Sequence, residues 1–473
     1  MPSSGSKGSL EGALRPSSGS KESLKSSGQS PPFTAASIPA VLYPVDNITD
    51  DQYNPGTPLI MTALHDTKSL VAFVQGVGDM HKWVLAGCQV GHQALDTNTK
   101  DVWQHMWWVV VECLYPKDPA FDPRTLNGGE ITLTFREKDG SAMKVLTSTF
   151  PFSASRSIPH VPSRLSRLSY KTCIVTQLYN QTHILKDWAT YHNRIGIDHI
   201  LIYDNDSDDD LLGFIAREGL SNLITVIRFP WGKSQAAAFL HGKVLADRLC
   251  HWTFFPDVDE YLFLKFCRPT MSPPSFRHCL AEFIRNQTAY SFSSPDQRPP
   301  RNSQLLIVPK IFSSSNIVHR PPQPYTLSET FLLRSPLPHA HATLTHKPLI
   351  NSRTAQLSTA IHRFKIAPPH TSTTISTKIA ELIHYKAQSW EDYMLKYNRP
   401  RNGFVRNWML PKGLKWPLSR DRPPKGWREG TFFHGQRELA NATVQDTEFR
   451  DWKREMERVL GVGTPDPLHN TRR

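Results

Sequence analysis

Cysteine and long apolar runs are scarce in this chain of 473 residues. Six cysteines are too few for a disulfide scaffold, and their even number permits disulfides without establishing them. Because no C-x-x-C pair occurs, we do not expect a structural zinc site. The chain has no run of about 18 apolar residues and no apolar segment near its start, so it predicts neither a membrane anchor nor a signal peptide.

Glycine is also outnumbered by proline, 25 to 38, which favours extended and irregular segments over long helices. What the chain does have is positive charge, a net +13, which suits an anionic partner. The basic residues are dispersed, and no zinc finger or RNA-binding motif accompanies them, so nucleic acid is not an expected partner. An apolar fraction of 39% supports a large packed core and excludes a collagen-like or wholly disordered chain.

Five N-x-[ST] glycosylation sequons occur, at Asn47, Asn180, Asn205, Asn286 and Asn441. Such triplets often arise by chance, and two of them lie in motifs that we interpret as buried or functional. They are therefore a weak indication of secretion.

The N-terminal third of the chain divides into a polar tail and a β-rich segment. Residues 1–38 are rich in Ser, Gly and Lys and predict a disordered tail. Over residues 41–152, short apolar runs alternate with turn clusters, and the run Ile131–Phe135 has the period of two that is typical of a half-buried strand. We expect a sandwich-like accessory domain here, followed by a basic linker at 153–169. If this domain binds carbohydrate, exposed aromatic rings would stack on sugars, with candidates at Trp103, Trp107 and Trp108.

From Tyr170 onward, apolar strands alternate with amphipathic helices in units of about 25 to 30 residues. This pattern predicts a parallel sheet of the nucleotide-binding type, with ligands at the carboxyl ends of the strands. The predicted strands are 172–178, 198–203, 223–229 and 252–255, and the predicted helices are 184–195, 211–216 and 235–249.

The fourth predicted strand runs into Asp257-Val258-Asp259-Glu260. Two carboxylates spaced by one residue at a strand end can hold Mn²⁺ or Mg²⁺ against a diphosphate, because these hard cations prefer oxygen ligands. The alternative is an exposed acidic turn. The position after a buried strand favours the metal site.

The second predicted strand ends in Asp204-Asn205, where polar side chains could bind a nucleoside. The alternative is a solvated turn in which Asp206 or Ser207 caps the following helix. Both interpretations stay open, since different residues would serve each.

Several motifs together resemble glycosyltransferase family 92, which includes the plant β-1,4-galactan synthases. The resemblance extends over about residues 170–407. It is carried by CIVTQLYNQTHILKDWATYHNRIGIDHILIYDNDSDDD, FPWGKSQAAAF and WTFFPDVDEYLF, and then by HKPLI from His346, AIH from Ala360, IHYK from Ile383 and SWE from Ser389.

The resemblance implies an α/β chain with a GT-A glycosyltransferase domain, Rossmann-like and mostly parallel, at 170–415, and a C-terminal extension with a short helix at 416–473. It also implies an inverting, metal-dependent transfer of a sugar, with UDP-galactose as donor and a glycan such as pectic β-1,4-galactan as acceptor. The resemblance further implies a location in the Golgi lumen or membrane and assembly into a homodimer.

The implied residue roles are as follows. Asp257 and Asp259 match the family D-x-D, and His384 would complete the metal shell, with His362 as its rival. Lys386 would face the diphosphate, and Tyr385 between the two would point into the core. Asp204, Asn205 and Gln235 would join Asp257 and Lys386 in binding the nucleotide sugar. Glu329 resembles a family glutamate and is the candidate general base.

The segment 308–316 lacks the Trp and Gly residues that the family tends to carry. A second hypothesis therefore stays open, in which the chain is a weakly active or inactive relative that binds glycan.

Overall fold

The computed structural model describes residues 59–65, 69–75, 82–105, 108–118, 120–152, 170–231, 234–268, 276–290, 292, 299–313, 315, 317–334, 346–359, 362–386, 388–392 and 444–461. The predictions for the tail at 1–38, for the linker at 153–169 and for the side chains of Trp103, Trp107 and Trp108 lie outside this part of the chain.

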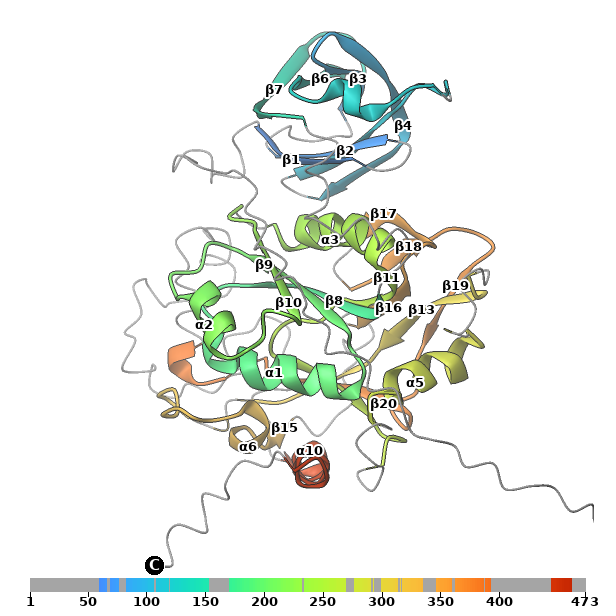
Figure 1. Cartoon of the computed structure of the whole chain (residues 1–473). Coiled ribbons are helices and arrows are strands. Elements are labelled where there is room, and N and C mark those ends of the chain that lie inside the picture. The colour runs from blue at the N-terminus through green and yellow to red at the C-terminus, as the bar shows by residue number, and fades with distance from the viewer. Residues whose placement is uncertain are drawn as a thin grey trace, which may run out of the picture. The chain divides into compact units, whose positions relative to one another are not determined.

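The β-rich segment forms one antiparallel sheet in the order β1-β2-β5-β4-β3-β6-β7 (Figure 1). Its strands are β1 (Leu59–His65), β2 (Ser69–Gln75), β3 (Trp83–Val90), β4 (Gln93–His105), β5 (Trp108–Leu114), β6 (Glu130–Glu137) and β7 (Met143–Pro151). Along β6, Ile131, Leu133 and Phe135 are buried and the residues between them are not, which confirms the period of two. These side chains share one apolar core with residues of β2 and β5, and a disulfide between Cys88 and Cys113 ties β3 to β5.

The second region contains the alternating strands and helices that the apolar pattern predicted, within a few residues at each end. They are β8 (Tyr170–Leu178), α1 (Thr182–Ile195), β9 (His199–Asp204), α2 (Leu211–Arg217), β10 (Ile224–Arg228), α3 (Gln235–Leu249) and β11 (Cys250–Phe254). The four strands are parallel and lie in the order β10-β9-β8-β11. The cap of α2 is Asp210, whose carboxylate accepts the backbone N–H of Gly213, rather than Asp206 or Ser207.

Later segments extend this sheet and add a smaller one. Beyond β11 the sheet continues through β16 (Lys347–Asn351), β13 (Asn302–Ile307) and β19 (Thr371–Thr374), and the β11–β16 and β16–β13 pairs are antiparallel. A separate sheet joins β12 (Glu260–Leu264), β20 (Ala380–His384) and β14 (Pro309–Ile311). The remaining elements that matter below are α5 (Cys279–Thr288), α6 (Leu327–Thr330) and α10 (Glu448–Val459).

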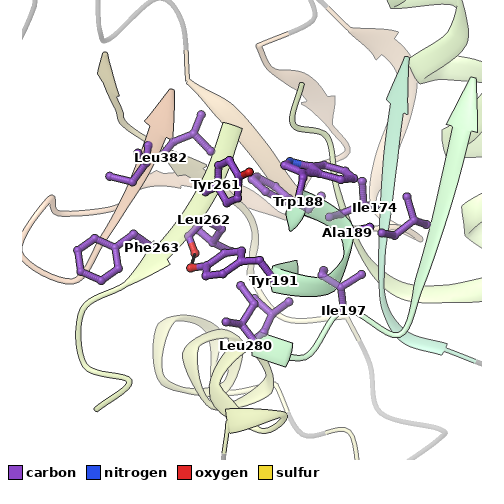
Figure 2. Close-up of a cluster of buried hydrophobic side chains, with 14 of the residues drawn as sticks. Ile174, Trp188, Ala189, Tyr191, Ile197, Tyr261, Leu262, Phe263, Leu280 and Leu382 are labelled. Atoms are coloured by element: carbon purple, nitrogen blue, oxygen red, sulfur yellow. Dashed lines mark hydrogen bonds between the residues drawn. The ribbon is translucent and has the colours of Figure 1, made fainter. Parts of the chain in front are cut away.

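A large aromatic core holds α1 against β12 (Figure 2). The hydroxyl of Tyr191 donates to the carbonyl of Leu262 at 2.7 Å, and the indole N–H of Trp188 donates to the carbonyl of Glu260 at 2.7 Å. Both bonds are buried and attach α1 to the backbone just after the D-x-D. They therefore fix the position of the acidic motif relative to the parallel sheet.

The C-terminal helix α10 packs into this same core. Phe449 and Met456 are fully buried within it, and Lys453 pairs with Asp187 of α1 at 2.8 Å. Among the helices of the described residues, none has the length and apolar character needed to cross a membrane.

Candidate active site

The sheet has a topological switch point between β8 and β11. From β8 the chain moves to β9 and β10 on one side, and it returns to β11 on the other. Figure 1 shows α1 and α3 on opposite faces of the sheet. In open α/β sheets the crevice for a ligand lies at such a point, outside the carboxyl ends of the strands. The segment from Phe255 to Asp259 leaves β11 at this position.

Asp257 is held from two sides. The side-chain amide of Gln235, the first residue of α3, donates to Asp257 Oδ1 at 2.6 Å. Lys347 Nζ, from β16, lies 2.9 Å from Asp257 Oδ2. The backbone N–H of Asp257 donates to Glu260 Oε2 at 2.7 Å, which closes the tight turn between β11 and β12. Gln235 thus contacts the first aspartate of the motif, and its role in binding the nucleotide sugar stays a prediction.

His384 reaches the acidic motif through sheet pairing. β20 runs antiparallel to β12 with His384 opposite Glu260, and the backbone N–H of Tyr385 donates to the carbonyl of Asp259 at 3.0 Å. His384 Nε2 lies 3.8 Å from Asp259 Oδ1, and Nδ1 lies 3.3 Å from Glu260 Oε1. One ligand atom from each of Asp257, Asp259 and His384 lies within 4.8 Å of the others. This set of two carboxylates and an imidazole suits a Mn²⁺ or Mg²⁺ ion.

Two charged residues in the site had no role assigned from the sequence, namely Glu260 and Lys347. Burial raises the pKa of Glu260 well above its usual range; the cation of Lys347 acts to lower it, while Asp257 and Asp259 raise it. For Lys347, burial acts to lower the pKa, but the carboxylates outweigh it and the pKa is raised. The signals in the sequence were weak: Glu260 directly follows the D-x-D, and Lys347 stands in the HKPLI motif.

His362, the rival ligand, lies close to the site without joining the three-ligand group of the described residues. Its Nδ1 lies 3.2 Å from the carbonyl oxygen of His346. Burial lowers the pKa of His362 to about 4, with further lowering by the cations of Lys347 and Lys386, while Asp257 acts in the opposite direction. These influences show that Lys347 and Lys386 both lie near enough to His362 to act on its charge.

The alternation predicted for the segment after β20 is confirmed at Tyr385. Its side chain is fully buried and packs against Tyr261 and Phe312, whereas His384 and Lys386 on either side are partly exposed. An extended segment directs alternate side chains to opposite faces, so His384 and Lys386 share a face.

Asp204 and Asn205 shape the loop after β9. The amide of Asn205 donates to the carbonyls of Phe229 and Trp231, at 2.9 and 2.8 Å, and so joins the loops that follow β9 and β10. The carboxylate of Asp204 accepts the backbone N–H of Ser207 at 3.0 Å, and burial raises the pKa of Asp204. Both residues therefore have a structural role in the turn.

Glu329, the candidate base, lies on α6 and forms an ion pair with Arg454 of α10. Arg454 Nε donates to Glu329 Oε1 at 2.8 Å on an exposed surface. The structure thus gives this carboxylate a partner from the C-terminal helix, and its role as a base stays a prediction.

Solved structures that match part of this chain include residues 1–349 of S. aureus TarS in complex with UDP-GlcNAc. This chain is 12% identical to it, with 48% of this chain and 64% of that chain covered and a TM-score of 0.27. A second is glucosyl-3-phosphoglycerate synthase from Mycobacterium tuberculosis, which is 11% identical over 30% of this chain and 44% of that one, with a TM-score of 0.18.

Curated relatives that this chain matches include plant proteins of one family. A glycosyltransferase family 92 protein of Ricinus communis is 26% identical over 67% of this chain and 51% of its own length. Family 92 proteins of Arabidopsis thaliana and Oryza sativa subsp. japonica are 25% and 28% identical, over 76% and 59% of this chain and 56% and 43% of their own lengths. The chain thus spans about half the length of the curated relatives it matches. The model of glycosyltransferase family 92 matches residues 169–415, more than half of the chain, and the protein therefore belongs to this family.

Proposed function

We propose that this chain transfers a sugar from a nucleotide sugar to a glycan acceptor, and that it does so with a divalent cation bound by Asp257, Asp259 and His384. The observation that carries the proposal is the convergence of these three ligands within 4.8 Å at the switch point of the sheet. Membership of family 92 supports the reaction class. The donor set fits Mn²⁺ or Mg²⁺, which both accept carboxylate oxygens and leave room for phosphate.

When bound, the cation would offset the charge of the diphosphate leaving group. The protein's own residues prepare this site. Gln235 and Lys347 hold the carboxylate of Asp257 from opposite sides, so its direction is set before any ligand arrives. Lys386, on the same face as His384, is assigned to the diphosphate. Asp204 is assigned to the nucleoside, and Asn205 to holding the loop around it.

The proposed donor, acceptor and cellular location follow from the motif resemblance described above. UDP-galactose is the proposed donor and a pectic β-1,4-galactan the proposed acceptor, within a GT-A domain that acts in the Golgi. The order β10-β9-β8-β11, with the acidic motif directly after β11, supports the GT-A assignment. The inverting outcome requires a base at the acceptor hydroxyl, and Glu329 remains the candidate.

One observation favours the second candidate function, a weakly active relative that binds glycan. Arg454 of α10 engages both carboxylate oxygens of Glu329, so this carboxylate cannot face an acceptor hydroxyl while the ion pair holds. Glu329→Gln distinguishes the two: loss of transfer with unchanged UDP binding supports a base, and an unchanged rate excludes Glu329 from this role.

The proposed function is tested by incubating the purified chain with a panel of UDP-sugars and a galactan oligosaccharide, with Mn²⁺ or with a chelator. We expect one donor to give an elongated product only when metal is present. Binding of UDP that is unaffected by the chelator, together with no product from any donor, would contradict the proposal.

A further inference from the structure

All six cysteines of the chain are paired, and the three disulfides lie in different parts of the fold. Cys88–Cys113 joins β3 to β5, Cys173–Cys250 joins the neighbouring parallel strands β8 and β11, and Cys267–Cys279 attaches the start of α5 to the loop after β12. Disulfides persist in oxidising compartments such as the secretory pathway and are rare in the cytosol. The same compartments attach N-linked glycans to exposed sequons.

Three of the five sequons lie in the described residues. In two of these, the asparagine side chain forms hydrogen bonds within the protein. The amide nitrogen of Asn180 donates to Asp208 Oδ2 at 3.0 Å, and its Oδ1 accepts the backbone N–H of Asp208 at 2.6 Å. Asn205 donates to two carbonyls, those of Phe229 and Trp231. A glycan on Nδ2 replaces one amide hydrogen, so at Asn205 it would break one of these bonds and loosen the contact between the loops that follow β9 and β10.

The third asparagine, Asn286, differs from these two because its side chain lies on the surface. It lies in the last turn of α5, and its side chain is exposed, as is that of Arg285 beside it. The buried face of this helix is formed by other residues, namely Cys279, Leu280, Phe283 and Ile284. The helix ends at Thr288 and is followed by Ala289 in the left-handed conformation, so the sequon Asn286-Gln287-Thr288 lies at the end of the element.

We propose that Asn286 is an N-glycosylation site. In the modification, the amide nitrogen of Asn286 forms a bond to the anomeric carbon of an oligosaccharide carried on a lipid pyrophosphate. The bond from that carbon to the pyrophosphate oxygen breaks, the lipid pyrophosphate leaves, and the amide gives up one proton. The donor and the transferring enzyme are those of the secretory compartment that the disulfides indicate. The inference does not depend on the proposed sugar transfer.

The test uses the full chain isolated from the cells that produce it. Its mobility on a denaturing gel is compared before and after peptide N-glycosidase, and peptide mass spectrometry reads whether Asn286 is converted to Asp. We expect a glycan at Asn286 in the unaltered chain. An unmodified Asn286 peptide overturns the proposal, whether or not other sequons carry a glycan.

Two variants of the third sequon residue form a matched pair. Thr288→Ala removes the sequon, and Thr288→Ser keeps both the sequon and a hydroxyl that can replace the bond from Thr288 Oγ1 to the carbonyl of Ile284. We expect the Asn286 glycan to disappear in the first variant and to remain in the second. Its persistence in Thr288→Ala, or its loss in a folded Thr288→Ser chain, counts against the assignment.

Discussion

Lys347 Nζ lies 2.9 Å from Asp257 Oδ2 and 3.5 Å from Glu260 Oε2, and the side chain of this lysine is only 2% exposed. A buried ammonium group therefore lies beneath the acidic motif and offsets part of its charge. The arrangement depends on β16, because the carbonyl of Pro348 accepts the backbone N–H of Phe255 just before the motif. Without this cation, Asp257 and Glu260 would lose the ammonium group that faces both of them.

Removing this cation should destabilise the fold. We expect Lys347→Met to lower the free energy of unfolding by about 3 to 5 kcal/mol, the usual cost of leaving a buried charge without its partner. Chemical denaturation measures the difference. Lys186→Met is the matched control, because Lys186 is exposed and its ion pair with the partly exposed Glu218 should contribute less than about 1 kcal/mol. Equal effects of the two substitutions would show that Lys347 does not compensate the acidic motif.

The second aspartate of the motif should be essential for metal-dependent turnover. Asp259→Asn keeps the volume of the side chain but removes its charge, so we expect turnover to fall by orders of magnitude, about 1.4 kcal/mol in activation free energy for each factor of ten. Steady-state assays with Mn²⁺ measure the effect, and a thermal unfolding curve checks the fold. A folded Asp259→Asn chain with near-normal turnover excludes Asp259 as a ligand.

The two histidines near the motif should behave differently. His384→Ala removes one of the three converging ligands, so we expect it to weaken Mn²⁺-dependent UDP binding in calorimetric titrations. His362→Ala should affect this binding less, and Tyr385→Phe should leave it nearly unchanged because that ring lies in the core. Loss of binding in His362→Ala with normal binding in His384→Ala would reverse the assignment.

Stability should fall in acid because of buried histidines. Burial lowers the pKa of His192 and His241 to about 3 and that of His199 to about 4, so all three stay neutral in the folded chain. In the unfolded chain they bind protons below a pH of about 6.5. The unfolded state thus binds more protons between these values, and the free energy of unfolding should fall by about 1.4 kcal/mol per pH unit for each histidine.

Denaturation curves between pH 7 and the folded pKa of about 4 measure this slope. The slope should become shallower in a folded His199→Gln variant, since Gln does not titrate and can still bond to Thr225. The exposed His92→Gln serves as control. Identical slopes in both variants would show that the acid sensitivity arises elsewhere.

The C-terminal helix should be needed for the fold although it lies beyond the segment that matches the family model. Met456 of α10 is fully buried in the core that contains Tyr191 and Tyr261, so Met456→Ala should lower the free energy of unfolding by about 2 to 5 kcal/mol. Arg458→Ala, on the exposed face of α10, is the control and should cost far less. A Met456→Ala chain as stable as the control would show that α10 is dispensable.

The local pattern of apolar and polar residues predicted much of this fold. The alternation of strands and helices from Tyr170 to Phe254 follows from apolar periodicity, which reflects burial on one face of each element. The D-x-D could be assigned because it directly follows a buried strand. The antiparallel extension through β16 and β13 was not predicted, since sheet pairing between distant segments leaves little local signal.

By itself, the sequence determined the order of the elements, the place of Asp257 and Asp259 at a strand end, and the burial of Tyr385. The tertiary structure alone decided which histidine of the described residues reaches them, because the pairing of β12 with β20 brings His384 beside Asp259 from a distant part of the chain. It also decided that Lys347 lies beneath the motif and that Glu329 is bound by Arg454. Such contacts depend on how strands pair and helices pack. The spacing of residues along the chain predicts neither the pairing of distant strands nor the packing of distant helices.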